Sequence, residues 1–370
     1  MVVDGVEARS SARPATAEEL AAALAEAASE GLRVTPVGGG RALGMGNTPT
    51  RVDLALDTTG LDRVVEFSPH DLTVTVEAGI RLDALQAELA TARQFLPLDP
   101  FGGPGHTIGG LLATGWSGPL RLRYGTPRDY LVGLRVALPD GKLARSGGRV
   151  VKNVSGYDLN KLHLGALGTL GVIVEASFKL FPSPLFEASL VRHFDQLETA
   201  LGEASRALEL RMPPVALDLI RGESGFTLAA RVAGSEAGAR RIIGELGWEA
   251  APAGFWEEHG HSGAATWVRL SVRRDALSAI LRALPEKARW IAQPGVGVAH
   301  WFDPASPSGF LAIRAAVEAE GGSAVILAAP VEFKREVGAW GAPPPTIDLM
   351  RKLRAAFDPG ETINQGRYLV

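Results

Sequence analysis

The run Lys152-Asn153-Val154-Ser155-Gly156-Tyr157-Asp158-Leu159, followed after a short gap by Gly168-Thr169-Leu170-Gly171-Val172-Ile173, is the most distinctive stretch of this sequence. The chain has 44 glycines among 370 residues, and they crowd into 38–46, 102–118 and 147–171. Loops that hold a phosphate need glycines, because backbone N–H groups must approach an anion without an intervening Cβ. The crowding therefore predicts phosphate-cradling loops in the first half of the chain.

Two earlier glycine loops occur in a similar setting. Gly38-Gly39-Gly40-Arg41 directly follows a strand-like stretch, residues 32–37, so its N–H groups are placed to hold a pyrophosphate. An ordinary tight turn is the alternative that this segment alone leaves open. In the run 102–115, Thr107 can cap a helix whose first turn is built of glycines. No glycine loop has the dinucleotide-binding spacing G-x-G-x-x-G, and no Gly-Lys-Ser/Thr loop occurs.

Composition excludes several classes of protein. The 38 Lys and Arg against 41 Asp and Glu give a formal net charge of -3, which lacks the basic excess of a general nucleic-acid binder. The absence of cysteine excludes disulfides, thiolate metal sites and a cysteine nucleophile. Residues 1–10 carry two acids and no apolar run, and no 18-residue uncharged apolar stretch occurs. We expect a cytoplasmic protein whose membrane contact is at most peripheral, on the inner face of the cell membrane and through partners.

Short strands joined by turns, with few helices between them, predict an α+β fold for the first half. Thr16-Ala-Glu-Glu19 is a capping box and predicts a helix after it. Pro139-Asp140-Gly141 predicts a hairpin between two strands. The expected helices are 17–30, 81–92 and a short one from Thr107, and the expected strands are 32–37, 52–56, 64–67, 72–76, 130–138, 142–146 and 170–180.

The character of the sequence changes near residue 184, where glycine becomes rare. Strands then alternate with single helices, as in a ferredoxin-like β-α-β sheet. The expected strands are 215–220, 226–232, 265–272, 290–301 and 323–329, and the expected helices are 235–246, 274–284, 309–319 and 347–357. We expect three parts: a glycine-loop domain over 1–184, a ferredoxin-like α+β cap over 185–345, and a C-terminal helix and tail over 346–370 that pack back on the first part.

Together the three loops resemble the PCMH-type FAD-binding domain of the vanillyl-alcohol oxidase and methylphenol hydroxylase superfamily, across about residues 14–184. Within it, Gly-His-Thr-Ile-Gly-Gly, Trp116-Ser-Gly-Pro119, Lys152 to Asp158 and Gly168-Thr-Leu-Gly-Val resemble the glycolate oxidase E-subunit family in order and spacing. The ending, with Asp358-Pro-Gly360 and Asn364-Gln-Gly-Arg367, is similar to that family's closing phrase, although Gln365 stands where Pro is usual. The resemblance implies two α+β subdomains around FAD.

The resemblance also implies cofactor-binding residues. The FAD pyrophosphate would meet the first loop, the second loop would line the ribityl and ring region, and Val172 and Ile173 would meet the adenine through their main chain. The absence of Cys, and Arg41 where relatives bond flavin through His, imply non-covalent FAD. Two alternatives stay open: Tyr157 and Asp158 as helix caps, and His106 as a structural residue. The implied residues are Pro36, Gly38, Gly39, Gly40, Arg41, Ala42, Pro97, Gly105, His106, Thr107, Gly109, Gly110, Ser117, Gly118, Gly156, Tyr157, Asp158, Gly168, Gly171, Val172 and Ile173.

Catalytic residues are not identified. Related D-2-hydroxyacid dehydrogenases carry a metal-binding phrase in the second domain, and its counterpart here, residues 293–300, retains only His300 of the ligand types. One histidine does not make a metal site, so we predict none. The segment 257–261 is typical of a solvated loop. Arg269, Arg273 and Arg274 are interpreted as alternating or terminal charges on a strand that face water, and binding of a carboxylate is the alternative that stays open.

Three functions stay open at this stage. The first is an FAD-binding subunit of a glycolate oxidase complex, which oxidises glycolate or D-lactate to the 2-oxo acid with a D-type flavin subunit and an F-type iron–sulfur subunit as partners. The second is a stand-alone FAD-dependent hydroxy-acid or alcohol dehydrogenase. The third is a non-catalytic, flavin-containing assembly subunit.

Overall fold

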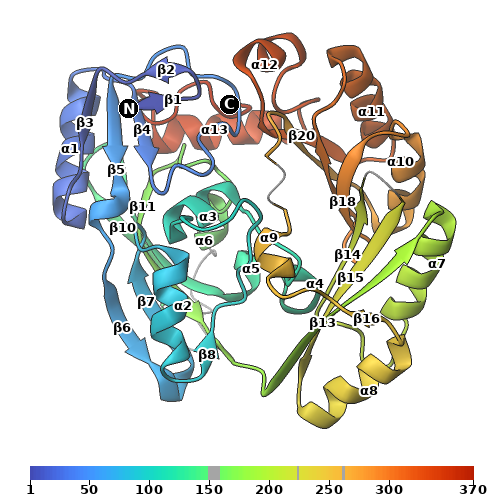
Figure 1. Cartoon of the computed structure of the whole chain (residues 1–370). Helices are drawn as coiled ribbons and strands as arrows, with labels where there is room; N and C mark the ends of the chain where they lie inside the picture. The colour runs from blue at the N-terminus through green and yellow to red at the C-terminus, as the bar shows by residue number, and fades with distance from the viewer. Residues whose placement is uncertain (149–158, 223–224, 261–262) are drawn as a thin grey trace.

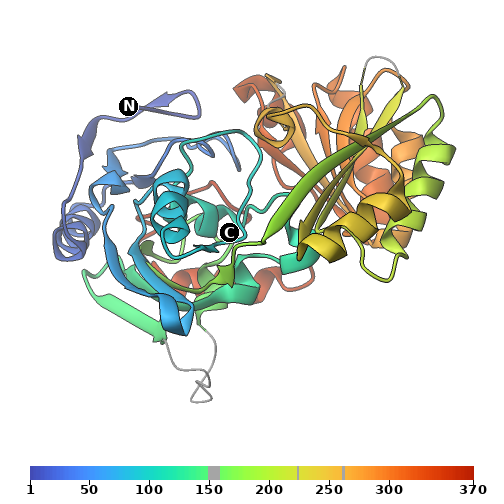
Figure 2. The same ribbon diagram turned by 60° about the horizontal axis from the view of Figure 1, so that its bottom comes forward.

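The computed structural model describes residues 1–148, 159–222, 225–260 and 263–370. It has the expected mixed α+β fold, with two bodies side by side (Figure 1). The first body contains the glycine loops, and the second is built on one large sheet (Figure 2). Within the described residues, no helix is long and apolar enough to cross a membrane.

A three-stranded parallel sheet opens the first body, in the order β3-β5-β4. Thr16 caps α1 by accepting a hydrogen bond from the Glu19 backbone N–H at 3.1 Å, and the Glu19 carboxylate accepts from the Ala15 N–H at 2.8 Å. Leu20 and Leu24 of α1 are fully buried against the sheet. The elements are β1 (Val2–Val3), β2 (Val6–Glu7), β3 (Ser10–Ala12), α1 (Ala17–Ser29), β4 (Val34–Val37) and β5 (Leu54–Asp57).

A five-stranded antiparallel sheet completes the first body, in the order β10-β9-β11-β7-β6. The predicted hairpin around Pro139–Gly141 is confirmed, because β9 and β10 pair antiparallel on either side of it. Helix α3 packs on β11 and brings the second glycine loop against the first. The elements are β6 (Val64–Ser68), β7 (Thr73–Glu77), α2 (Leu82–Ala90), β8 (Gln94–Phe95), α3 (Ile108–Thr114), α4 (Arg121–Tyr124), α5 (Pro127–Tyr130), β9 (Leu131–Ala137), β10 (Leu143–Gly147), α6 (Asn160–His163), β11 (Val172–Lys179) and β12 (Phe181–Pro182).

The second body is an eight-stranded antiparallel sheet, in the order β16-β13-β15-β14-β18-β19-β17-β20. Each half has the chain order β-α-β-β-α-β and the strand order of a ferredoxin-like unit, so the expected motif occurs twice. The halves join through β14 and β18. Their elements are β13 (Phe186–Phe194), α7 (Leu197–Leu208), β14 (Ala216–Arg221), β15 (Phe226–Gly234), α8 (Glu236–Leu246) and β16 (Glu249–Ala250), then β17 (Trp267–Ser271), α10 (Leu277–Ala283), β18 (Arg289–Gln293), β19 (Val298–Phe302), α11 (Pro307–Ala319) and β20 (Ser323–Ala328).

Neither β13 nor α7 is predicted from the sequence. Strand β13 shows no regular alternation between buried and exposed residues. Period-two alternation is the signal by which a strand is recognised in a sequence.

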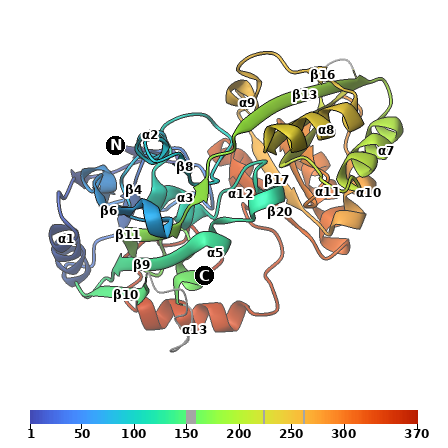
Figure 3. The same cartoon turned by 90° about the horizontal axis from the view of Figure 1, so that it is seen from below.

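The chain end returns to the first body. Helix α13 (Ile347–Phe357) lies along the outer side of that body (Figure 3), where Phe357 contacts the His163 ring edge-on at 5.9 Å. Ile363 then bridges to Val34 of β4. Between β20 and α13, helix α12 (Val331–Val337) packs next to the N-terminal hairpin. We keep the division into 1–184, 185–345 and 346–370 as a proposal.

Candidate cofactor-binding site

A groove runs between the first two glycine loops and the chain end. We call it the glycine groove. It contains nine of the predicted cofactor-binding residues: Pro36, Gly38, Gly39, Gly40, Arg41, Ala42, His106, Thr107 and Gly110. It adds residues that were not predicted: Thr35, Leu43, Met45, Ala113, Thr114, Trp116, Leu167, Asn364 and Arg367.

Close packing explains the glycines at two positions of the first loop. A Cβ on Gly38 would overlap the Thr107 hydroxyl, and a Cβ on Gly39 would overlap the Gly105 carbonyl. The two loops therefore touch through their backbones. Arg41 ties them further, since its Nε donates to the Pro104 carbonyl at 2.7 Å. Its guanidinium thus contacts a backbone carbonyl rather than a carboxylate.

Thr107 is the residue on which both loops converge. It caps α3 and accepts hydrogen bonds from the N–H groups of Gly110 at 3.3 Å and Gly39 at 3.4 Å. A Cβ on Gly110 would meet only the Thr107 hydroxyl, at 3.1 Å, and would otherwise stand in the groove. Gly109 is different, because its N–H donates to the Ala78 carbonyl at 2.6 Å and a Cβ there would press on Ala78.

The remaining predicted residues lie outside the groove wall. Gly118 packs against the Asp99 backbone, and the Val172 and Ile173 side chains are buried in two different cores. Gly168 is near the groove, with Pro36 and Asn364 just under 4 Å from where its Cβ would stand. Gly156, Tyr157 and Asp158 lie outside the described residues. The residues not in the wall, whose cofactor role stays a prediction, are Pro97, Gly105, Gly109, Ser117, Gly118, Gly168, Gly171, Val172 and Ile173.

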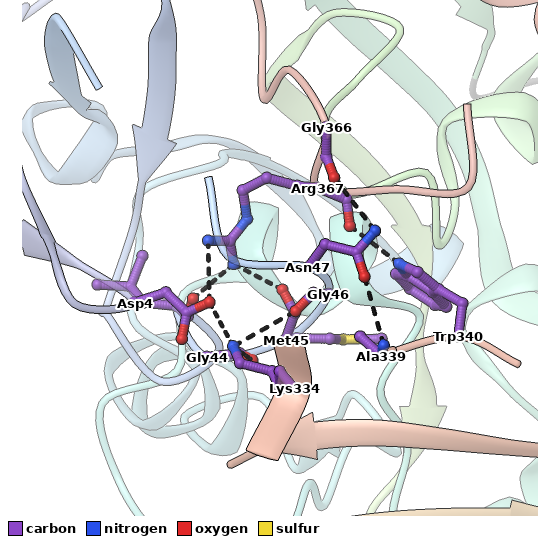
Figure 4. Close-up of polar contacts among 11 residues, drawn as sticks. Asp4, Gly44, Met45, Gly46, Asn47, Lys334, Ala339, Trp340, Gly366 and Arg367 are labelled. Carbon is purple, nitrogen blue, oxygen red and sulfur yellow. Dashed lines mark hydrogen bonds and ion pairs between the residues drawn. The ribbon is translucent and has the colours of Figure 1, made fainter. Parts of the chain in front are cut away.

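The first loop is also held from behind by a buried ionic cluster, the Asp4 cluster, made of Asp4, Lys334 and Arg367 (Figure 4). Lys334 pairs with Asp4 and donates to the Gly44 carbonyl at 3.0 Å. Arg367 donates to the carbonyls of Leu43 and Met45 at 2.5 and 2.6 Å. The cluster thus joins the N-terminal hairpin, helix α12 and the chain end to the loop that forms one groove wall.

The chain end is anchored by a second buried pair. Asp358 accepts the backbone N–H groups of Thr362 and Ile363 at 2.9 and 2.8 Å, and Arg354 lies 3.2 Å from its carboxylate. Arg354 also donates to the Ile363 carbonyl at 2.6 Å. Gln365, which departs from the usual closing phrase, donates to the Glu361 carboxylate at 2.8 Å. The Asp358–Arg354 pair thus anchors the chain end through residues other than Gln365.

Comparisons with known proteins agree with this geometry. Residues 9–147 match the sequence model of the FAD binding domain family. The glycolate oxidase subunit GlcE of Escherichia coli is 36% identical over 198 residues, which is 53% of this chain and 55% of that protein. The glycolate oxidase subunit GlcD of Bacillus subtilis is 33% identical over 208 residues, 56% of this chain and 44% of that protein. Residues 9–147 thus carry an FAD-binding domain.

Other relatives extend the comparison. The D-lactate dehydrogenase of Archaeoglobus fulgidus is 34% identical over 212 residues, 56% of this chain and 46% of that protein. The chain spans about half the length of the curated relatives it matches. A structure of alkyldihydroxyacetonephosphate synthase has a TM-score of 0.67 at 17% identity, over 95% of this chain and 76% of that one. This likeness supports the fold over nearly the whole chain.

FAD is the cofactor of this domain, and the glycine groove fits it. Gly110 leaves its side of the groove open, so that backbone can approach a ligand there. Leu43, Met45 and Trp116 give an apolar lining suited to flat rings, and the backbone of Gly38–Ala42 is suited to phosphates.

Aromatic rings from both bodies meet at one end of the groove. Trp116 of the FAD-binding domain and Trp267 of β17 lie 5.3 Å apart. His106 bonds the Phe101 carbonyl through Nε2 at 3.1 Å, and burial lowers its pKa to about 4. Trp267 donates to Nδ1 of His300 at 3.0 Å, and burial lowers the pKa of His300 to about 3. Both histidines are therefore neutral at physiological pH.

The absence of a metal site from the cap stays a prediction. In the described part of the chain, no group of three or more His, Asp or Glu side chains is arranged to hold a metal ion. His300 lies opposite Ile291 in the β18–β19 hairpin. Gln293 pairs with Val298 in the same hairpin.

The interpretation of 257–261 as a solvated loop is wrong for His259. Its side chain is buried, and Nε2 lies 2.6 Å from the Asp218 carboxylate, which is also buried. The His259 ring contacts Phe255 and Trp256. The surrounding rings exclude water from a segment whose composition is polar.

Asp99 gives a pH-dependent prediction. Burial raises the pKa of its carboxyl from 3.8 to about 8, and Oδ1 has no hydrogen-bond partner while Oδ2 accepts from the Leu120 N–H at 2.9 Å. The folded state thus keeps a proton that the unfolded chain releases near pH 4. The stabilising contribution of Asp99 is complete below about pH 4 and is lost as the pH rises towards 8.

We expect Asp99→Asn to remove this loss, because asparagine is neutral and can still accept from the Leu120 N–H. The free energy of unfolding of the variant, relative to the parent, should rise by up to about 1.4 kcal/mol per pH unit between about pH 5 and pH 8. Urea unfolding at several pH values measures it. Parallel pH profiles for the two proteins would show that Asp99 is ionised in the folded state.

Proposed function

We propose that this chain is the FAD-binding subunit of a glycolate oxidase-type complex and takes part in oxidising glycolate or D-lactate to the 2-oxo acid. The glycine groove carries the proposal, since it joins both glycine loops and the chain end around a site that fits FAD. Relatives named as glycolate oxidase subunits and D-lactate dehydrogenases support the hydroxy-acid class of substrate.

The proposed partners are a D-type flavin subunit and an F-type iron–sulfur subunit. Such partners are needed because an oxidation of this kind requires an outlet for electrons, and a chain without cysteine cannot bind an iron–sulfur cluster through thiolates. The names of two relatives, which are subunits, support an assembly. We infer non-covalent FAD from the same lack of cysteine and from Arg41 in the first loop.

Bound FAD supplies the acceptor for the two electrons that leave a hydroxy acid. The residues of this chain bind it, exclude water and orient the substrate. Trp116 lines the groove and is buried, and its ring lies 5.3 Å from that of Trp267 with the two planes tilted by 35°. Because Nδ1 of neutral His300 accepts from Trp267, its proton is on Nε2, and the ring is a donor there and not a base.

His106 has the opposite arrangement. Its Nε2 donates to the Phe101 carbonyl, which leaves Nδ1 as the acceptor nitrogen of the ring. With a pKa of about 4, this nitrogen is a weak base at neutral pH. We therefore assign no catalytic base to this chain, which agrees with a role that depends on partner subunits.

Visible absorption of the purified chain tests the proposal. We expect flavin absorption from the chain expressed alone, little anaerobic bleaching by glycolate or D-lactate, and bleaching when the D-type and F-type partners are added. Bleaching of the chain alone would instead identify a stand-alone dehydrogenase. A flavin that stays oxidised throughout turnover of the assembled complex would identify a non-catalytic assembly subunit.

A further inference from the structure

A second pocket, the basic pocket, lies where the cap meets the FAD-binding domain, next to the glycine groove. Strand β17 and the β18–β19 turn form its cap side, and the ends of α3, α4, α5 and α6 form the other side. Gly115 lines it, and the neighbours of Gly115 in the chain, Thr114 and Trp116, line the groove. The two cavities therefore share the C-terminal end of α3.

The charges in the basic pocket all have one sign. Its lining contains Arg121, Arg128, Lys161 and Arg269, and no Asp or Glu of the described residues lines it. The expectation that Arg269 faces water is wrong: its side chain is half-buried and its Nε is fully buried. Arg273 lies beyond the end of the same strand, largely exposed, and pairs with Asp275. Arg269 is more buried than Arg273 because its strand, β17, lies between β19 and β20 and because Arg269 faces the other body.

Neither Arg121 nor Arg269 forms an ion pair with any residue that the structure describes. Among those residues, the Nε of Arg269 also has no hydrogen-bond partner. Burial lowers the pKa of both, and the nearby charge of Arg121 lowers the pKa of Arg269 further. The charge of Asp129 opposes the effect of burial on the pKa of Arg121. Two half-buried like charges close to one another are still unfavourable, and a bound anion would reduce that cost.

The shape of the charged groups selects the anion. A guanidinium presents parallel N–H groups that match the two oxygens of a carboxylate, so arginine suits a planar carboxylate better than a point charge. The surroundings are small and partly apolar, with Val272, Val296 and Val298 in the lining. This lining suits a short organic acid without further charges.

We propose that Arg121 and Arg269 together bind the carboxylate of a small hydroxy or keto acid, between the cap and the FAD-binding domain. The inference rests on the proposed function for the class of acid, and it adds the binding site and its two residues. Because one arginine comes from each body, the bound acid would also hold the cap against the FAD-binding domain.

The test is carboxylate binding by the FAD-loaded chain, followed by calorimetry and by thermal unfolding, with glycolate, D-lactate and the unreactive dicarboxylate oxalate as probes. We expect Arg269→Met and Arg121→Met each to weaken binding roughly 10- to 100-fold. Without ligand, both variants should unfold at the same or a higher temperature than the parent, because a half-buried charge has been removed. Arg273→Met is the matched control and should bind like the parent, since Arg273 is exposed and paired outside the pocket.

Several results would overturn the site. No binding of any carboxylate by the parent would do so, as would parent-like affinity in both arginine variants. Equal protection by sulfate, or by the uncharged glycolamide, would show that the pocket does not recognise a carboxylate. Arg121→Met serves as the second variant because it lies in the other body, so a folding defect of Arg269→Met leaves the test intact.

Failure of this inference is distinct from failure of the proposed function. If glycolate bleaches the flavin of the assembled complex and the arginine variants bind it normally, only the site is wrong. If the arginines are required for carboxylate binding but no hydroxy acid ever bleaches the flavin, the site stands and the proposed function is wrong.

Discussion

Gly110→Val should give a folded protein that retains no FAD. Valine is more favourable than glycine within a helix, and outside the backbone of its own helix the new Cβ would meet the Thr107 hydroxyl at 3.1 Å, so the fold should tolerate the change. The branched side chain would instead fill the part of the glycine groove that Gly110 leaves open. The ratio of flavin absorption to protein absorption after purification, together with the thermal midpoint of the apoprotein, measures both effects.

The chain provides a close control in Gly309. This glycine stands in the first turn of α11, its N–H donates to the capping Ser306 hydroxyl at 3.1 Å, and a Cβ there would meet only that hydroxyl. Gly309→Val therefore repeats the local change at a site outside the groove, and it should retain FAD. If Gly110→Val kept its flavin as well, the groove would not be the cofactor site.

The variant Gly39→Val tests whether Gly39 is needed for packing against the second glycine loop or for contact with the cofactor. A Cβ at this position overlaps the Gly105 carbonyl, so the substitution forces the two glycine loops apart. We expect loss of FAD together with a clearly lower thermal midpoint of the apoprotein. A flavin-free variant with an unchanged midpoint would show that Gly39 contacts the cofactor and not the second loop.

Local signals explain what the sequence predicts well. The capping box at Thr16, the turn at Pro139–Gly141 and the cap at Thr107 each depend on residues a few positions apart, and each occurs in the structure as expected. The first two glycine loops are also recognisable, because glycine is required where backbones touch. Such features need no knowledge of the rest of the chain.

Long-range placement explains what the sequence does not predict. Arg269 lies within β17 and Arg273 lies just beyond its end, and only the packing of β17 between two strands and against the other body makes Arg269 half-buried. Asn364 and Arg367 reach the groove from the far end of the chain. The closing phrase signals that these two residues matter, but nothing local shows which loop they contact.

Asp4→Asn should be strongly destabilising, although Asp4 is in the N-terminal hairpin and far in sequence from the groove. Among the described residues it is the carboxylate of the Asp4 cluster, and the side chains of Asp4, Lys334 and Arg367 are all buried. Asparagine also tolerates the left-handed backbone of this position, where φ is 51°, so the change removes mainly the charge. Two buried cations without a counter-charge should lower the free energy of unfolding by about 3 to 5 kcal/mol.

Urea unfolding measures this loss, and Asp348→Asn is the control. Asp348 pairs with Arg351 on the exposed side of α13, where ion pairs contribute little, so its variant should unfold like the parent. The double variant Asp4→Asn/Lys334→Met should be less destabilised than the sum of its single variants, because the methionine removes a cation that has lost its partner. Additive effects would show that Asp4 and Lys334 do not interact.

The same variant connects the N-terminal hairpin to the cofactor. Lys334 and Arg367 hold the carbonyls of Leu43 to Gly46, directly after the residues that form one groove wall. If Asp4 keeps these two cations in place, Asp4→Asn should weaken FAD binding even at temperatures where the protein stays folded, and Asp348→Asn should not. Flavin retention during dialysis at low temperature separates this effect from unfolding. If Asp4→Asn retained FAD as well as the parent protein does, the Asp4 cluster would contribute to stability but not to FAD binding.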